Sequence, residues 1–332
     1  MRAWQLTRLG DPWDELEAVE VDPPEPGEGQ ARIEVEGADV NFADILQCQG
    51  SYQVKIDVPF VPGMSAAGTV VAVGPGSGLS VGQRVVGSTS GAWGGFATEA
   101  IVHGADVHPL PDDVDGVVAA GLHVTYGTAW FALHRRGHLA PGESVLVLAA
   151  AGGVGSAAVQ LAKAHGCWVL GAAGGPDKVR AVTELGADLA FDYDPGPGEP
   201  DLHTAVMEAT SGRGVDVVYD PVGGAYFDVA RRLVAWEGRL LVVGFASGTI
   251  PAAPANHLLV KNYSVVGVHM GGYRAMDPAV ITRCYDEVYA QLARGEIDPL
   301  ITERLGFDGL PEGLRRLAER RTVGRIVVDP RG

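Results

Sequence analysis

Cysteine and positive charge are both scarce in this sequence. Only three of its 332 residues are cysteines (Cys48, Cys167 and Cys284), too few for a disulfide framework or a four-thiolate zinc site and typical of a reducing cytosol. Lys and Arg number 25 against 41 Asp and Glu, a net charge of −16. Without a basic stripe to hold a phosphate backbone, nucleic acid is not expected as the main ligand.

Long hydrophobic segments are scarce as well. The N-terminus has no apolar core of a signal peptide, which together with the cysteine content predicts a cytoplasmic protein. Residues 144–162 carry no charge over 19 positions, about the length of a membrane span. Gly152, Gly153 and Gly155 interrupt this stretch, and its first half is typical of a buried strand, its second half of a helix. No membrane partner is therefore expected.

Glycine, in contrast, is abundant, with 47 residues that indicate many tight turns. In the first 110 residues, short β-type runs alternate with Pro and Gly clusters, which predicts an all-β region with irregular loops. These runs are 32–35, 68–73, 84–86 and 99–103.

From about residue 115 the pattern changes to helices alternating with apolar strands. This alternation predicts an α/β fold with a parallel, doubly wound sheet, and the length suggests two domains. The expected strands are 145–149, 167–172, 189–192, 215–219 and 239–243. The expected helices are 117–133, 154–165, 177–185, 201–210 and 225–235, followed by helices 279–294 and 311–320 and a last strand at 324–328.

A glycine-rich turn joins strand 145–149 to the helix after it. Against the dinucleotide-binding pattern GxGxxG, the glycine positions are Ala150, Gly152 and Gly155, with alanine in the first. The second glycine lets the backbone approach a pyrophosphate and the third lets helix and strand pack closely. Gly153 and Val154 lie at the start of the helix, whose free N–H groups favour phosphate. The alternative is a tight turn that binds nothing.

The end of the second strand bears on which dinucleotide is bound. An NAD enzyme has Asp or Glu there for the ribose 2′-hydroxyl, but strand 167–172 runs into Ala173 and two glycines. The first acid, Asp177, follows Pro176 and is typical of the first turn of a helix. Because Lys178 comes next, the pattern favours NADPH. The alternative is that Lys178 is only a solvated helix residue.

Several motifs occur together and in order along nearly the whole chain. The motifs are VNFAD (40–44), PGMSAAG (62–68), GGFA (94–97), VTYGTA (124–129), AAGGVG (150–155), LGAD (185–188), GRLLVVGF (238–245) and GRIVV (324–328). By these motifs the sequence resembles the zinc-independent quinone oxidoreductases of the medium-chain dehydrogenase/reductase superfamily.

The resemblance implies a GroES-like, mostly-β catalytic domain in residues 1–122 and an NADPH-binding Rossmann domain in residues 123–268. Residues 269–332 would form a C-terminal segment that completes the catalytic domain. It also implies a homodimer formed through the edge strand of the nucleotide domain, near residues 263–268.

Zinc ligands are not retained at the positions where the alcohol dehydrogenase branch keeps them. Aligned by the motifs, these positions hold Asn41, Met64, Ser65 and Val124, whereas zinc is bound by thiolate, imidazole or carboxylate. Residues 84–110 contain no cysteine for a structural zinc lobe. No metal is expected.

The resemblance implies catalytic roles for three residues. Asn41 and Tyr52 would line the acceptor cleft and donate hydrogen bonds to an acceptor oxygen, and Thr128 would touch the nicotinamide. The alternatives are that Asn41 fixes a turn, Tyr52 separates two domains and Thr128 caps a helix. Asp44 is expected to hold the loop that carries Asn41, and Leu46 stands where some members of the family have a second tyrosine.

Further residues would bind the cofactor by the same resemblance. Gly174, Tyr193 and Arg320 would join Lys178 around the 2′-phosphate of NADPH, and Gly244 and Phe245 would flank the nicotinamide ribose.

The best-supported function at this point is an NADPH-dependent oxidoreductase that reduces a small-molecule acceptor, a quinone, by hydride or single-electron transfer without a metal. The nearest alternative is reduction of an activated C=C bond in a conjugated carbonyl compound such as a 2-alkenal, an enone or an enoyl thioester. An alternative of a different class is a non-catalytic NADPH-binding or sensor protein.

Overall fold

The structure, a computed structural model, describes every residue except 194–195 and 197–198. It divides into two compact units. The first comprises Met1–Val124 together with Ile301–Gly332, and the second comprises Thr125–Leu300. The chain passes from the first unit to the second within helix α3 (Gly116–Trp130).

The first unit contains a six-stranded sheet in the order β13-β14-β3-β4-β5-β6, in which β3 also pairs with β6 and so closes four strands into a barrel. A two-stranded sheet of β1 and β2 lies in the same unit. The elements are β1 (Arg2–Leu6), α1 (Pro12–Glu15), β2 (Leu16–Glu20), β3 (Gln30–Asp39), α2 (Phe42–Cys48), β4 (Ser65–Val73), β5 (Arg84–Thr89), β6 (Glu99–Pro109), β13 (Ile301–Gly306), η3 (Phe307–Gly309), α11 (Leu310–Ala318) and β14 (Arg325–Asp329).

Helix α2 lies in the region that the sequence predicts to be all-β. It begins after Asn41, and Asp44 at its third position accepts a hydrogen bond from the Asn41 backbone N–H at 2.8 Å. Asn followed three residues later by an acid is a helix-start signal, so the all-β prediction is incomplete here. The remaining contact of Asp44 agrees with its expected role of holding this loop, because its other oxygen accepts from the Met64 N–H at 2.9 Å.

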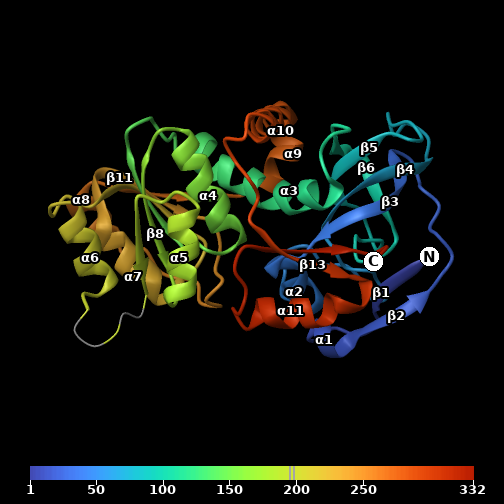
Figure 1. Ribbon diagram of the computed structural model, residues 1–332, viewed down its shortest axis with the longest axis horizontal. Helices are drawn as coiled ribbons and strands as arrows, with labels where there is room; N and C mark the ends of the chain where they lie inside the picture. Colours follow the sequence, from blue (N-terminus) through green and yellow to red (C-terminus); the bar gives the residue numbers. More distant parts are fainter. Residues whose placement is uncertain (194–195, 197–198) are drawn as a thin grey trace. The chain divides into compact units, whose positions relative to one another are not determined.

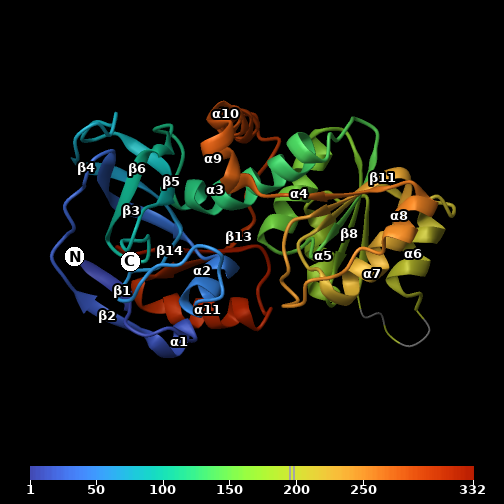
Figure 2. The ribbon, with the colours of Figure 1, turned by 180° about the vertical axis from the view of Figure 1, so that it is seen from behind.

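The last strand of the chain, β14, pairs with β3 near the start of the chain. β14 runs antiparallel to β3, with Val327 opposite Asp39, and parallel to β13. Figure 2 shows the C-terminal strand β14 next to the blue β3. The tail thus adds two strands to the sheet of the first unit.

The second unit is built on a six-stranded parallel sheet in the order β12-β11-β10-β7-β8-β9. Helices α4 and α5 cover one face and α6 and α7 the other (Figure 1), which confirms the predicted doubly wound sheet. The elements are η1 (Phe131–Arg136, a π-helix), β7 (Ser144–Leu148), α4 (Gly153–Ala164), β8 (Trp168–Ala173), α5 (Pro176–Glu184), β9 (Leu189–Asp192), α6 (Leu202–Ala209), β10 (Val215–Asp220), α7 (Gly224–Leu233), β11 (Val234–Val242), α8 (Ala255–Lys261), β12 (Ser264–Gly267), η2 (Met270–Gly272), α9 (Tyr273–Met276) and α10 (Pro278–Ala293).

The C-terminal boundary differs from the expected return to the first unit at residue 269. Residues 269–300 belong to the second unit. Helix α10 is held there by contacts to the end of α3, where the Trp130 indole N–H donates to Glu287 at 2.7 Å and the Cys284 thiol lies 3.9 Å from the Gly127 carbonyl. Only the residues from Ile301 onward complete the first unit.

One continuous helical stretch, Gly116–Arg136, is long and apolar enough to cross a membrane by length and composition. In the structure 83% of its most apolar window is buried within the protein. Its apolar side chains are therefore used in packing, as in the core helix of a globular protein.

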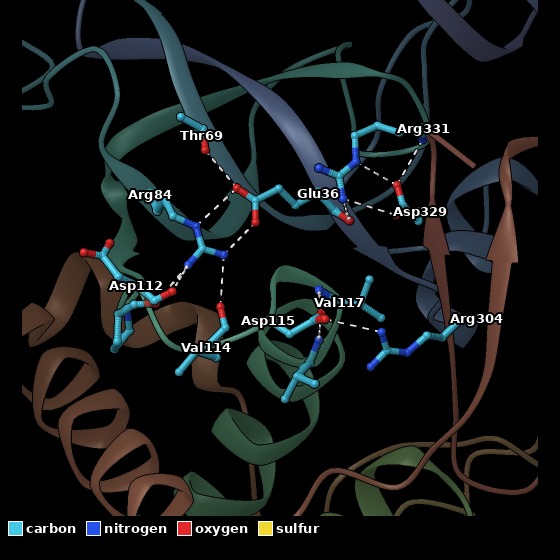
Figure 3. Close-up of polar contacts among 12 residues, drawn as sticks. Glu36, Thr69, Arg84, Asp112, Val114, Asp115, Val117, Arg304, Asp329 and Arg331 are labelled. Carbon is cyan, nitrogen blue, oxygen red and sulfur yellow. Dashed lines mark hydrogen bonds and ion pairs between the residues drawn. The ribbon is translucent and has the colours of Figure 1, made fainter.

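Charged side chains from distant parts of the chain meet in the first unit (Figure 3). Glu36 on β3 accepts hydrogen bonds from Arg84 at 2.6 Å and from Thr69 at 2.8 Å, and Arg84 also donates to the carbonyls of residues 111, 112 and 114. Burial acts to raise the pKa of Glu36, but the hydrogen bonds from Arg84 and Thr69 outweigh it and lower the pKa below its ordinary value. The ionised form is therefore favoured by folding.

We expect Glu36→Gln to lower the thermal unfolding midpoint at pH 7 by about 3–8 °C, because it removes charge-assisted hydrogen bonds from a poorly exposed group. A pKa lowered by folding gives stability that is present above the unfolded-state pKa, about 4.3, and is lost as the pH falls through the folded-state value. Scanning calorimetry from pH 7 down to pH 3 should therefore show wild type and variant converging.

The matched control is Glu296→Gln. Glu296 forms an ion pair with Arg294, and the two side chains are 39% and 56% exposed. An exposed ion pair of this kind contributes about 0–1 kcal/mol to the free energy of unfolding. Equal losses in the two variants at pH 7 would contradict the role given to Glu36.

Candidate active site

The strand order of the second unit creates a switch point between β7 and β10. After β7 the chain builds β8 and β9 on one side, then crosses over and places β10 on the other side of β7. The loops at the carboxyl ends of these two strands therefore diverge to opposite faces, and in open α/β sheets ligands bind at this place. The glycine-rich turn lies directly after β7.

The geometry of this turn requires glycine at one position above all. A Cβ on Gly155 would lie 2.1 Å from the Ala149 carbonyl oxygen, whereas a Cβ on Gly152 would lie 3.3 Å from it. Gly155 thus allows the close approach of α4 to β7 that the pattern predicts. Gly152 precedes the helix, and Gly153 and Val154 begin it and are partly exposed. The Gly152 N–H donates to the Ala149 carbonyl oxygen at 2.9 Å. The N–H groups that fit a pyrophosphate are therefore those of Gly153 and Val154 at the start of the 12-residue helix.

Alanine in the first position of the pattern is accommodated by its neighbours. Ala150 is fully buried, and its N–H donates to the Ala172 carbonyl at 3.0 Å. A Cβ on Gly171 would lie 3.0 Å from the Cβ of Ala150. The missing side chain of Gly171 therefore leaves room for that of Ala150.

The segment after β8 is open and rich in glycine. Gly174 is exposed, and Gly175, with φ of +85°, immediately precedes α5 and has no neighbour within 4 Å of the position of a Cβ. Lys178 lies in the first turn of α5 and is partly exposed. Arg180 forms an ion pair with Asp177, and both are exposed. This pair neutralises Arg180, and the role of Lys178 toward a phosphate remains a prediction.

A carboxylate that the sequence interpretation missed lies beside this segment. Asp192, the last residue of β9, accepts a hydrogen bond from the Gly175 N–H at 3.0 Å. The acid comes from the neighbouring strand rather than from the end of β8. The signal was available, because the ends of adjacent parallel strands lie at the same edge of a sheet, and Asp192 pairs in register with Ala173.

Tyr193 is directed to the glycine-rich turn. Its hydroxyl accepts a hydrogen bond from the Ala149 N–H, and its ring lies 4.4 Å from that of Tyr226 between centroids. Burial raises the pKa of the hydroxyl, so it stays protonated. The predicted contact of this hydroxyl with a 2′-phosphate remains a prediction. To make it, the hydroxyl must either give up its hydrogen bond with the Ala149 N–H or keep that bond while donating to the phosphate.

Gly244 and Phe245 follow β11 and pack against the loop after β10. The Gly244 N–H lies 3.4 Å from the Asp220 carbonyl oxygen, and Phe245, 39% exposed, lies close above Gly223. The buried carboxylate of Asp220 accepts from the Val222 and Gly223 N–H groups at 2.8 and 2.9 Å. The two loops are thus tied together at the carboxyl edge of the sheet.

Asn41 lies in the first unit and is 6% exposed. Its side-chain oxygen accepts a hydrogen bond from Arg325 at 2.8 Å, and its amide nitrogen lies 3.4 Å from the Asp39 carbonyl oxygen. Asp44 beneath it is fully buried, and burial raises its pKa to about 7 against the opposing effect of the N–H groups of Asn41 and Met64. The side chain is therefore part of a buried polar network.

The remaining candidates are divided between the two units. Tyr52 is half-buried in the loop after α2, where its N–H donates to the Leu46 carbonyl at 3.1 Å. Arg320 is exposed just after α11, with φ of +58°. Both belong to the first unit, whereas Thr128, partly exposed on α3, belongs to the second.

The residues at the positions where the alcohol dehydrogenase branch keeps its zinc ligands do not fit zinc in this chain. Asn41 faces a guanidinium, which would repel a dication, and Met64, Ser65 and Val124 supply no thiolate, imidazole or carboxylate. Among the residues that the structure describes, no group of three or more His, Cys, Asp or Glu side chains could hold a metal ion. No step in the chemistry is therefore assigned to zinc.

Two family models match the chain. The alcohol dehydrogenase GroES-like domain matches residues 27–112, and the zinc-binding dehydrogenase model matches residues 153–284. The quinone oxidoreductase-like protein 2 homolog of Nematostella vectensis is 38% identical over 306 residues, which cover 91% of this chain and 82% of that protein.

Solved structures are similar over the whole length. The quinone oxidoreductase from Thermus thermophilus, also described in complex with NADPH, has a TM-score of 0.84 and 33% identity and covers 99% of this chain and 100% of its own. A mycobacterial protein complexed with NADPH has a TM-score of 0.90 and 31% identity, again covering 99% and 100%. These similarities confirm the predicted GroES-like and Rossmann-type units.

We expect Gly155→Ala to destabilise the second unit by roughly 1–3 kcal/mol, because the new methyl group overlaps backbone that cannot move away. Gly152→Ala is the matched control, since its Cβ meets the same carbonyl oxygen at 3.3 Å and its φ is −86°. Thermal unfolding followed by circular dichroism compares them. Equal midpoints for the two variants would contradict the packing described for α4 and β7.

Proposed function

Since the chain belongs to the zinc-independent quinone oxidoreductases of the medium-chain dehydrogenase/reductase superfamily, we propose that it is an NADPH-dependent reductase of quinones. The observation that carries the proposal is the glycine-rich turn at the switch point, where Gly155 allows α4 to approach β7 closely and α4 begins with N–H groups that have no partner within the helix. Two structural neighbours with this fold are described with NADPH.

The second unit binds the dinucleotide. The turn from Ala150 to Gly155 holds the pyrophosphate, and the segment from Gly174 to Lys178 holds the 2′-phosphate with Tyr193. Arg320, which belongs to the first unit, is a further candidate for this phosphate. Gly244 and Phe245 flank the nicotinamide ribose. Bound NADPH supplies a hydride equivalent, two electrons and one proton, and a second proton from water completes the conversion of quinone to hydroquinone.

The first unit supplies the polar groups for the acceptor. Asn41 and Tyr52 donate hydrogen bonds to its oxygen atoms, and Thr128 of the second unit contacts the nicotinamide. A quinone is already a good electron acceptor, so it can react without a metal to polarise its carbonyl group. Asn41, buried and fixed by Arg325, is suited to a site from which water is excluded.

We also propose that the protein is a cytoplasmic homodimer. β12 is an edge strand of the parallel sheet, with pairing on one side only. Exposed apolar side chains occur on the two elements that precede it in the chain. Leu259 and Val260 on α8 are 82% and 73% exposed, and Trp236 on β11 is 65% exposed. An open edge and exposed apolar side chains support pairing with a second copy.

The acceptor is tested by steady-state oxidation of NADPH with 1,4-benzoquinone, a 2-alkenal and crotonyl thioester in parallel. We expect kcat/KM for the quinone to exceed that for each C=C acceptor by at least about tenfold, a difference of about 1.4 kcal/mol in activation free energy. Faster reduction of an enal or thioester would assign the protein to the alternative reaction. NADPH binding without oxidation by any acceptor would indicate a binding protein.

For the cofactor we expect Kd for NADPH to be at least tenfold below that for NADH, about 1.4 kcal/mol. Charge-assisted hydrogen bonds to a phosphate are strong, so Lys178→Ala and Arg320→Ala should each weaken NADPH binding and leave NADH binding nearly unchanged. Fluorescence titration of both nucleotides measures this. Equal curves for the two nucleotides in the wild type would refute the preference.

Two controls separate local charge from the named contacts. Arg180→Ala removes a guanidinium already paired with Asp177 and should leave both affinities unchanged. Asp192→Asn keeps an oxygen for the Gly175 N–H and removes one negative charge, so the preference for NADPH should increase. A loss of NADPH affinity in Arg180→Ala as large as in Lys178→Ala would mean that net charge, rather than Lys178, determines the preference.

A further inference from the structure

The last strand of the chain contributes a buried arginine to the surroundings of Asn41. Arg325 on β14 is 7% exposed, forms an ion pair with Asp39 on β3, and donates from Nη2 to Asn41 Oδ1 at 2.8 Å. Asp39 is fully buried. The three side chains come from a sheet pairing in which β14 and β3 are neighbours, so their arrangement is held by the backbone of two strands.

This contact determines which way the Asn41 amide faces. A guanidinium has only donors, so it requires the amide oxygen on its own side. The NH₂ group is therefore directed away from Arg325. It makes a long contact of 3.4 Å with the Asp39 carbonyl oxygen, beyond the usual range for such a bond, and it also acts to lower the pKa of the Asp39 carboxyl group, which burial raises.

The backbone and the side chain of Asn41 both take part in a capping box with Asp44 at the start of α2. Its N–H donates to Asp44 at 2.8 Å, and Asp44 in turn accepts from the Met64 N–H at 2.9 Å. The position of the residue therefore depends on Asp44, and the polarity of its amide depends on Arg325 together with the Asp44 backbone N–H. A change at Arg325 can alter the second without moving the first.

We propose that Arg325 is a positioning residue that makes Asn41 a hydrogen-bond donor to the acceptor oxygen. This inference rests on the proposed function. As the quinone accepts the hydride equivalent, negative charge develops on a carbonyl oxygen, and a preorganised N–H donor stabilises that charge more than the neutral ground state. The guanidinium behind the amide polarises it further, while Asp39 compensates the charge of Arg325.

The arrangement also selects the class of substrate. A fixed donor suits compounds that present a conjugated carbonyl oxygen, which accepts hydrogen bonds and gains charge on reduction. It does not help to remove the hydroxyl proton of an alcohol, for which an acceptor group is needed. We therefore expect reduction of conjugated carbonyl acceptors and negligible oxidation of simple alcohols.

The test is a double-mutant cycle on the full-length protein with NADPH and 1,4-benzoquinone. Arg325→Lys keeps a positive charge for Asp39 but cannot reproduce the guanidinium fork, and kcat should fall at least about tenfold with Kd for NADPH within twofold. Asn41→Asp keeps an oxygen for Arg325 and replaces the donor by a carboxylate, so kcat should fall about a hundredfold. In the double variant Arg325→Lys should add little further loss.

The matched control is Arg304→Lys. Arg304 lies on the neighbouring strand β13, its side chain is 55% exposed, and it forms an ion pair with Asp115. This variant should retain wild-type kcat. Wild-type kcat in Arg325→Lys, or losses that multiply in the double variant, would overturn the positioning role. If Arg325→Lys does not fold, the test rests on Asn41→Asp. Wild-type kcat in that variant would then overturn the positioning role of Arg325.

A second measurement does not depend on turnover. With ¹⁵N-asparagine labelling, the side-chain NH₂ signal of Asn41 is identified by its loss in Asn41→Asp, and duroquinone is added without NADPH. The signal should shift in the wild type and shift less in Arg325→Lys. A wild type without quinone reductase activity contradicts the proposed function, whereas an active wild type whose Asn41 signal does not respond contradicts the inference alone.

Discussion

The buried ion pair between Asp39 and Arg325 is the interaction on which the first unit depends. It joins a strand near the start of the chain to the last strand, with Arg325 and Asn41 separated by 284 positions in sequence. Both partners lie in the core, where loss of one leaves an uncompensated charge at a cost of roughly 3–5 kcal/mol. The sheet of the first unit is thus complete only when the C-terminal strand is in place.

This constraint explains how the two units share one chain. The nucleotide-binding unit is a continuous segment, Thr125–Leu300, between the two parts of the first unit. Each unit can then specialise. The second presents backbone groups at the ends of parallel strands, and the first provides buried side chains whose orientation is set by charge.

The sequence was most informative where structure depends on local pattern. The alternation of strands and helices, and the spacing of Gly152 and Gly155, predicted the doubly wound sheet and the tight turn between β7 and α4 because short-range sterics determine both. Asp192 was missed because it acts on Gly175 through strand pairing rather than along the chain. Arg325 was part of a motif used for the resemblance, but its contact with Asn41 is created by the pairing of β14 with β3. The return of the chain at Ile301 instead of residue 269 likewise follows from packing of α10 against the end of α3, which no local pattern encodes.

A crystal structure with NADPH and duroquinone tests the central claim most directly. Its resolution must be high enough for the contacts of the Asn41 amide to show which of its two terminal atoms is nitrogen and which is oxygen. We expect the pyrophosphate at the N–H groups that begin α4, one quinone oxygen within hydrogen-bond distance of Asn41 Nδ2, and Asn41 Oδ1 still on Arg325. A quinone bound elsewhere, or an Asn41 amide turned with its NH₂ toward Arg325, would contradict the claim.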